Sequence, residues 1–300
     1  MRIMRFTSAI AVSGLLVTAL AGCGSSAKST ASAVPGAGAP APVASGGGTG
    51  AAGGLGVKAE LLATAAVMQK LGSAKVTVSS AEAGGDNGTG VYAWGDKPAL
   101  DLTSSNSGKP MRIRVVDGVA YLGVGDAQAA ELGGKHWAKL DSSGPAAGPG
   151  SSLQALSLLL DPALQLAAAA QSGKLSAVGA QSLNGTATQH YRSVMPADSL
   201  VAGIPNLKDD QRAALLDALK QDGSTVTSDF WVDAKHQLVQ QQEAGSDGAS
   251  AGASASASPD GSGTTITTYS DLGTKVSVSA PAASDQASAA DALKLLALIG

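Results

Sequence analysis

The spacing of apolar and polar residues changes several times along the chain, and each change predicts a different kind of element. Residues 9–21 form an apolar run without a charge, whereas residues 24–56 are nearly all Gly, Ala, Ser, Pro and Thr with no apolar period. Apolar side chains then recur at helical spacing over Val57–Leu71, and Gly72 is placed to end that helix. From Lys75 onward the period becomes two, which predicts β-strands.

The alternating pattern returns many times and is broken by turn signals, of which Asp117-Gly118 and Asn184-Gly185 are the clearest. Strands are expected at 76–78, 91–94, 100–102, 111–115, 119–124, 136–140, 175–178, 181–183, 186–195, 225–232, 237–242, 264–269 and 275–279. Strands and helices do not alternate as they do in βαβ units. The pattern therefore predicts an α+β fold with one large curved antiparallel sheet.

Helices are expected in a few clusters. Leu153–Leu160 is strongly apolar, and Asp161-Pro162 supplies an N-cap and first-turn pair for a helix to about residue 171. These two segments are expected to cover the mouth or one face of the sheet. A further helix is expected over residues 207–221, and an Ala-rich one over residues 285–299. Docking of this last helix on the domain is favoured over a tail that contacts a partner or a membrane.

The first residues have the features of an export signal. Arg2 and Arg5 precede the apolar run, and small residues follow it, which is typical of a secretory signal peptide over residues 1–22. The end of this segment, Leu20-Ala21-Gly22-Cys23, resembles the lipobox of bacterial lipoproteins. That resemblance implies that Cys23 receives a diacylglyceryl thioether and becomes the acylated amino terminus, which palmitate labels. The alternative is an ordinary signal peptide followed by a chance cysteine.

Composition divides the remaining chain into a tether and a domain. Residues 23–56 are expected to be a flexible tether with an r.m.s. reach of roughly 30 Å. Residues 57–300 are expected to form the domain, with the Ala/Ser-rich segment 243–263 as a disordered loop between two strands. After loss of Arg2 and Arg5 the chain has 18 basic and 23 acidic residues, a net charge of −5 with neutral histidines. This acidity argues against nucleic acid as a partner and leaves the acyl group as the membrane anchor.

No catalytic motif stands out. His136, His190 and His236 are far apart in the sequence, Cys23 is the only cysteine, and no metal-ligand spacing is present. The chain is therefore expected not to be an enzyme and to need no metal or cofactor. Binding is the remaining function class, because a curved sheet with an apolar face suits an apolar ligand. Six alternating apolar positions are candidates to line that face, with a dry core as the alternative: Met111, Ile113, Val115, Tyr121, Phe230 and Val232.

Several short segments, in this order and behind a lipobox, carry a resemblance to a known family. They are Met111–Leu122, Lys135–Leu140, Asn184–Tyr191, Phe230–Asp233, Gln237–Val239, Tyr269–Gly273 and Val276–Pro281. Together they resemble the actinobacterial LppX/LprAFG lipoproteins, whose domain is similar to the LolA/LolB lipoprotein carriers. The long Ala/Ser insert and the Leu-rich C-terminal end depart from that pattern.

The resemblance implies an incomplete antiparallel β-barrel with helices across its open face and an apolar cavity between them. It further implies that the protein is anchored by its lipid on the extracytoplasmic face of the cell membrane. There it would bind an acylated lipid or glycolipid, carry or present it, and work with an envelope transporter. The alternative is a non-catalytic envelope interaction or regulatory module with a filled core.

Overall fold

The computed structural model describes residues 50–80, 87–106, 109–140, 147–205, 207–220, 223–245, 264–288, 291 and 295. The predicted signal peptide (1–22) and Cys23 lie outside these residues. Of the predicted tether, only residues 50–56 are described, and most of the predicted loop 243–263 is not. Among the described residues, no helix has the length and apolar character needed to cross a membrane.

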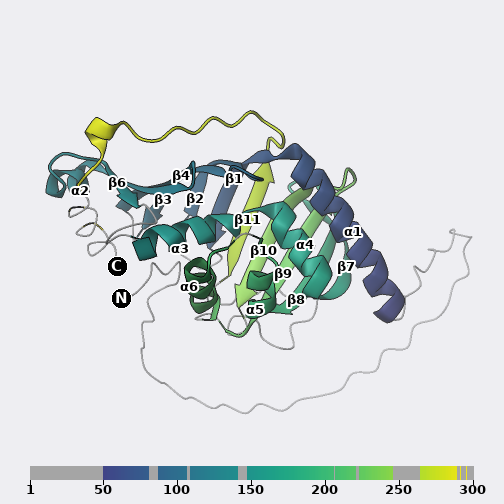
Figure 1. Ribbon diagram of the computed structural model, residues 1–300. Coiled ribbons are helices and arrows are strands. Elements are labelled where there is room, and N and C mark those ends of the chain that lie inside the picture. The colour runs from purple at the N-terminus through teal and green to yellow at the C-terminus, as the bar shows by residue number, and fades with distance from the viewer. Residues whose placement is uncertain are drawn as a thin grey trace, which may run out of the picture.

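Within the described residues, one sheet of eleven strands forms the body of the molecule (Figure 1). The strands are β1 (Ser73–Ser80), β2 (Asn87–Ala93), β3 (Ala99–Asn106), β4 (Lys109–Val116), β5 (Val119–Val124), β6 (Trp137–Leu140), β7 (Lys174–Leu183), β8 (Thr186–Pro196), β9 (Thr225–Asp233), β10 (Leu238–Gly245) and β11 (Thr265–Ser270). Their order is β6-β5-β4-β3-β2-β1-β11-β10-β9-β8-β7, and every neighbouring pair is antiparallel. β6 and β7 remain edges, so the sheet is curved but not closed. The predicted α+β class and the incomplete barrel are confirmed.

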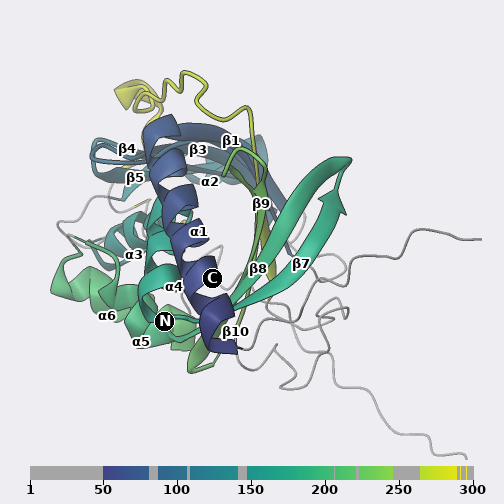
Figure 2. The same ribbon diagram turned by 90° about the vertical axis from the view of Figure 1, so that its right-hand side faces the viewer.

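The helices lie mainly on one face of this sheet, which we call the inner face. They are α1 (Gly50–Leu71), α2 (Asp126–Glu131), α3 (Ala147–Leu158), α4 (Pro162–Ser172), α5 (Ala197–Ala202) and α6 (Asp209–Lys220). α1 packs against α4, and α4 contacts β7 and β8. Figure 2 shows the sheet curving around α1 and α4. The opposite surface is called the outer face.

α1 is longer than the sequence indicates. It begins at Gly50, seven residues before the predicted start at Val57, so the end of the predicted tether is helical. Leu55 in this first part is 73% exposed, whereas Val57, Leu61 and Met68 are buried. Most of the predicted apolar face therefore packs inward, whereas Leu62, which was expected on the same face, is 40% exposed. Gly72 ends the helix with a φ of +69°, a conformation that glycine adopts without strain.

The local signals in the sequence correspond to the observed turns and caps. Asp117 and Gly118 both have positive φ between β4 and β5, and Asn184 and Gly185 have the same conformation between β7 and β8. This is the twist that a two-residue hairpin requires. Asp161 caps α4 as predicted, accepting hydrogen bonds from the backbone N–H groups of Ala163 and Leu164.

The prediction of a last strand at 275–279 is wrong. Residues 271–288, here called the C-terminal segment, run over the outer face as an irregular chain, seen in yellow in Figure 1. Val278 packs on Val116, Tyr121 and Trp137 of that face. The alternation of valines therefore reflects one-sided contact with a sheet surface and not pairing within the sheet.

The C-terminal segment then reaches the edge strand β6. The backbone N–H of Ala287 donates to the carbonyl of Trp137 at 2.7 Å, and Gln286 forms a parallel bridge with Trp137. Leu295, which is helical, is fully buried in the main apolar cluster with the inner-face side chains. This contact supports the docking of the chain end on the domain. Residues 285–288 are not α-helical, and most of the predicted closing helix lies outside the described residues.

Candidate functional site

Five of the six predicted lining residues face the helices. Met111, Ile113 and Val115 alternate along β4, and Phe230 and Val232 alternate along β9, with at most 6% of any of them exposed. All five belong to one buried apolar cluster. β4 and β9 stand on opposite sides of the central strands, so this cluster spans the width of the sheet.

Tyr121 does not belong to this group. It is paired with Arg114 across β5 and β4, and it packs with Val116 and Trp137 on the outer face. The inward positions of β5 are instead Ala120 and Leu122, which pair with Val115 and Ile113. β5 is apolar at nearly every position because both of its faces are covered, so alternation did not distinguish the two faces.

The helices complete the apolar cluster with residues that were not among the six candidates. Leu61 and Met68 of α1 and Leu166 of α4 are fully buried in it. The helical spacing of apolar residues over Val57–Leu71 predicts that Leu61 and Met68 turn inward, but it does not show which residues they contact. Trp94, the residue that follows β2, donates its indole N–H to the carbonyl of Met68 at 2.8 Å and so connects the end of β2 to α1.

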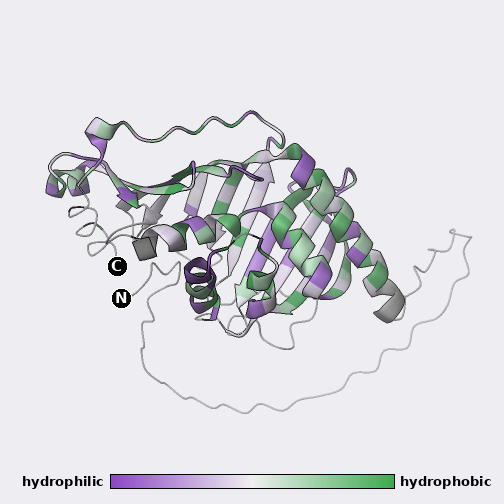
Figure 3. Ribbon diagram, viewed as in Figure 1, coloured by the Kyte–Doolittle hydropathy of each residue, from purple (hydrophilic) through white to green (hydrophobic). Residues whose placement is uncertain are grey.

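Polar side chains interrupt the inner face on the side of the sheet that ends in β7. Gln241 and Glu243 of β10 point the same way as Ser228 and Phe230 of β9, with which they pair. Figure 3 shows β10 and β11 in pale to purple colours between greener regions of the sheet. Burial raises the pKa of Glu243 to about 7, opposed by hydrogen bonds from Gln241 and from Gln165 of α4. The sequence segment Gln-Gln-Gln-Glu gave no sign that two of these residues face the interior.

A second carboxylate, Asp161, lies near these groups. Burial raises its pKa to about 6, although the two capping N–H groups oppose this shift. Tyr269 of β11 donates its hydroxyl to the carbonyl of Leu160 at 3.2 Å, next to that cap. Burial, followed by the nearby charges of Glu243 and Asp161, raises the pKa of Tyr269 well above its ordinary value. The interior therefore favours neutral forms of its titratable groups.

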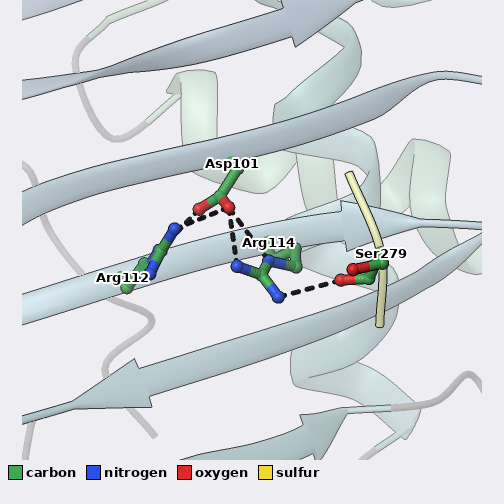
Figure 4. A network of polar contacts seen from close by, with 4 residues as sticks. All are labelled: Asp101, Arg112, Arg114 and Ser279. Atoms are coloured by element: carbon green, nitrogen blue, oxygen red, sulfur yellow. Dashed lines mark hydrogen bonds and ion pairs between the residues drawn. The ribbon is translucent and has the colours of Figure 1, made fainter. Parts of the chain in front are cut away.

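Charged side chains form hydrogen-bonded networks on the outer face. Asp101 of β3 accepts hydrogen bonds from Arg112 at 2.6 Å and from Arg114 at 2.7 Å, and Arg114 also donates to the carbonyl of Ser279 (Figure 4). Both guanidinium groups lie over the ring of Trp137, at 5.6 and 4.7 Å from its centroid. Arg114 thus connects the sheet to the C-terminal segment.

Each histidine has a carboxylate partner, but the three lie in different places. His190 Nε2 is 2.6 Å from Asp229, His136 Nδ1 is 2.9 Å from Asp285, and His236 Nδ1 is 2.7 Å from Glu60. His190 and Asp229 lie on the outer face, whereas Ser193 and Ser228 of the same strands point inward. Among the described residues, no group of three His, Cys, Asp or Glu side chains is arranged to hold a metal ion.

Comparisons with known proteins give the following likenesses. No family model matches the chain. A Streptomyces griseus protein, described as an uncharacterized 31.2 kDa protein in the rplA-rplJ intergenic region, is 29% identical over 223 residues, which are 69% of this chain and 70% of that protein.

Two crystal structures, of which the first is described as that of a lipoprotein, also resemble it. Mycobacterium tuberculosis LppX is 17% identical, with 75% of this chain and 99% of that one covered at a TM-score of 0.44. LprF from Mycobacterium bovis is 14% identical, with 76% and 98% covered at the same TM-score of 0.44. Both names belong to the family that the sequence segments resemble.

Proposed function

We propose that this chain is a lipid-anchored envelope protein that binds an acylated lipid or glycolipid between the inner face and the helices, and carries or presents it. One observation carries the proposal. A single apolar cluster extends from β4 and β5 to β9 beneath α1 and α4, while charged networks cover the outer face. Burying an acyl chain contributes about 0.8 kcal/mol per CH₂ group, so an acyl chain that lies along such a layer is stabilised by each CH₂ group that it buries.

The anchor is the second part of the proposal. The lipobox ending at Cys23 supports acylation of that cysteine, and the Gly/Ala-rich residues behind it support a short tether. The domain would then work on the extracytoplasmic face of the cell membrane, close to the bilayer that supplies or receives its ligand. An envelope transporter is the partner class that the family resemblance suggests.

Labelling with a palmitate analogue tests the anchor. We expect the native chain to incorporate the label and to remain in the membrane fraction. Cys23→Ala should abolish labelling and leave the signal peptide uncleaved by lipoprotein signal peptidase. Normal labelling of the Cys23→Ala variant would refute the assignment.

Native mass spectrometry of the purified protein tests the ligand. We expect a co-purifying acylated lipid, or the uptake of one from added vesicles. Ile113→Trp, which adds bulk to the inner face, should reduce the bound fraction severalfold. Thr103→Trp is the matched control, because Thr103 is exposed on the outer face of the neighbouring strand. Equal loss in both variants would contradict a site on the inner face.

A non-catalytic interaction module with a filled core is the second candidate. Its supporting observation is the burial of the inner side chains, since Leu61, Leu122, Phe230 and Leu238 all have 0% exposure. A protein partner that is cross-linked equally well in Ile113→Trp and in the native chain, without any bound lipid, would favour this candidate.

A further inference from the structure

Five polar side chains meet inside the apolar interior, and we call them the interior polar patch: Gln165, Ser193, Ser228, Gln241 and Glu243. Ser193, Ser228 and Glu243 are cross-strand neighbours on β8, β9 and β10. Gln241 precedes Glu243 by two residues and so shares its face. Gln165 reaches Glu243 from α4, on the other side of the interior.

The hydrogen bonds of the patch are incomplete. The side-chain amide of Gln165 donates to the carbonyl of Leu159 at 2.9 Å and also to Glu243, and Gln241 donates to Glu243. Within the described protein, four buried oxygens of the patch have no hydrogen-bond partner: Oε1 of Gln165, Oε1 of Gln241, Oγ of Ser193 and Oγ of Ser228. More than about 90% of buried polar groups in native proteins have a partner, so four in one place require an explanation.

The orientation of the two amides follows from their partners. A backbone carbonyl and a carboxylate can only accept, so the amide nitrogens of Gln165 and Gln241 must point to them. The amide oxygens are consequently the atoms left over. With Glu243, the patch offers mainly acceptors, and the two serine hydroxyls can both donate and accept.

The charge of the patch narrows the ligand chemistry. None of its five residues is basic, and the nearby Arg192 lies on the outer face, where it is bound to Asp229. A phosphate or carboxylate placed here would meet acceptors and a carboxyl group without a compensating cation. A hydroxyl group fits better, because it donates to the amide oxygens and also accepts from a serine.

The exposure of the interior polar patch, and its contact with the apolar cluster, also suit the polar end of an amphipathic molecule. Glu243 is partly exposed, whereas Gln165, Gln241, Ser193 and Ser228 are almost fully buried. Gln241 is paired with Phe230, which belongs to the apolar cluster. Polar and apolar surfaces thus adjoin within the same layer.

We propose that the interior polar patch binds uncharged hydroxyl groups of the ligand, while the acyl chain of that ligand lies along the apolar cluster. This inference rests on the proposed function, which it makes more specific. The protein would then select polyol-type acyl lipids over acyl lipids with an anionic head or without hydroxyl groups.

The test measures binding of three oleoyl probes to the purified protein by displacement of a fluorescent fatty acid. 1-Monooleoylglycerol has two hydroxyl groups, methyl oleate has none, and 1-oleoyl lysophosphatidic acid adds a phosphate. We expect 1-monooleoylglycerol to bind about tenfold tighter than either other probe, as one or two net hydrogen bonds would give.

Single substitutions test whether the interior polar patch causes the preference for 1-monooleoylglycerol. Ser228→Ala and Gln241→Met should each reduce the preference for 1-monooleoylglycerol over methyl oleate severalfold, with methyl oleate binding unchanged. Ser228→Ala removes only a hydroxyl that has no protein partner, whereas Gln241→Met removes the unpartnered Oε1 together with the amide that donates to Glu243. Thermal melts should show that both variants are folded, and Ser228→Ala alone suffices to test the preference. Ser104→Ala is the matched control, because Ser104 also has a buried hydroxyl without a hydrogen-bond partner. Ser104 lies in the same cross-strand row as Gln241, but on β3, four strands away from β10.

The outcomes separate the inference from the function on which it rests. If all three probes bind equally and the variants change nothing, the patch is only hydrated and the inference is wrong, while the proposed function stands. Tighter binding of the phosphate probe would also overturn the inference. If no oleoyl probe binds, the proposed function itself fails.

Discussion

Two carboxylates of the sheet, the buried Asp229 and the partly exposed Glu243, illustrate how neighbours decide the charge of a group. Burial by itself acts to raise the pKa of both carboxyl groups, but the net shifts differ in direction. For Asp229, hydrogen bonds from His190 and Arg192 outweigh burial and lower its pKa, with Arg192 at 2.8 Å. Glu243 has only amide donors, so burial prevails and its pKa rises to about 7.

Asp229 should therefore matter strongly for stability. Asp229→Ala leaves Arg192 and His190 without their buried acceptor, and we expect a loss of about 3 kcal/mol in the free energy of unfolding. Asp101→Ala is the comparison, because Asp101 likewise has two side-chain donors on the outer face, Arg112 and Arg114, but is more exposed than Asp229. There we expect about 1 kcal/mol. Urea denaturation measures both, and equal losses would contradict this ranking.

Glu243 should make stability depend on pH. Its pKa is about 7 in the folded protein against an ordinary value of 4.5, so the folded state holds more protons between these values. Stability conferred by the neutral carboxyl is therefore present at low pH and lost as pH rises through about 7. Glu243→Gln should remove part of this slope in melting temperature between pH 5 and pH 8.

The control for that slope is Glu131→Gln on the exposed end of α2. Some slope should remain in Glu243→Gln, because burial raises the pKa of Asp161 to about 6 and acts in the same direction. A Glu243→Gln profile that is parallel to the native one over this range would show that Glu243 does not titrate there.

At the scale of elements, local chemistry predicted the turns and caps well. Asp117-Gly118, Asn184-Gly185 and the Asp161 cap are determined by backbone conformation and short-range hydrogen bonds, which the residues themselves specify. Long-range contacts were not predictable in the same way. Val276 and Val278 alternate as in a strand, yet the segment lies on a sheet surface. The inward direction of Gln241 and Glu243 is likewise set by strand pairing.

The C-terminal segment should protect the edge strand β6. Ala287→Pro removes the N–H that donates to Trp137, so we expect faster amide hydrogen exchange in β6 and a red-shifted tryptophan emission. Ala283→Pro is the matched control. It lies at the first position of a 3₁₀ helix, and Ala282 before it already has extended backbone angles. Exchange in β6 that is unchanged by Ala287→Pro would contradict this role.

At the scale of the whole molecule, the sheet separates two chemical environments. Its outer face carries ion pairs and the C-terminal segment, and its inner face carries an apolar cluster that a polar patch interrupts at β8, β9 and β10. Five of the six positions that alternation in the sequence predicted to be inward do face the helices. The prediction failed at Tyr121, where both faces of β5 are covered. Neither the helix residues that face them nor the patch can be read from strand alternation.

The most direct measurement of the central claim is photo-cross-linking with an acylated lipid that carries a diazirine in its chain, followed by peptide mapping. The account predicts adducts on inner-face residues of β4, β5 and β9, such as Ile113, Leu122 and Phe230. It predicts none on Arg112 or Tyr121, their neighbours on the outer face. Adducts confined to the outer face, or no adduct at saturating lipid, would contradict a ligand site between the sheet and its helices.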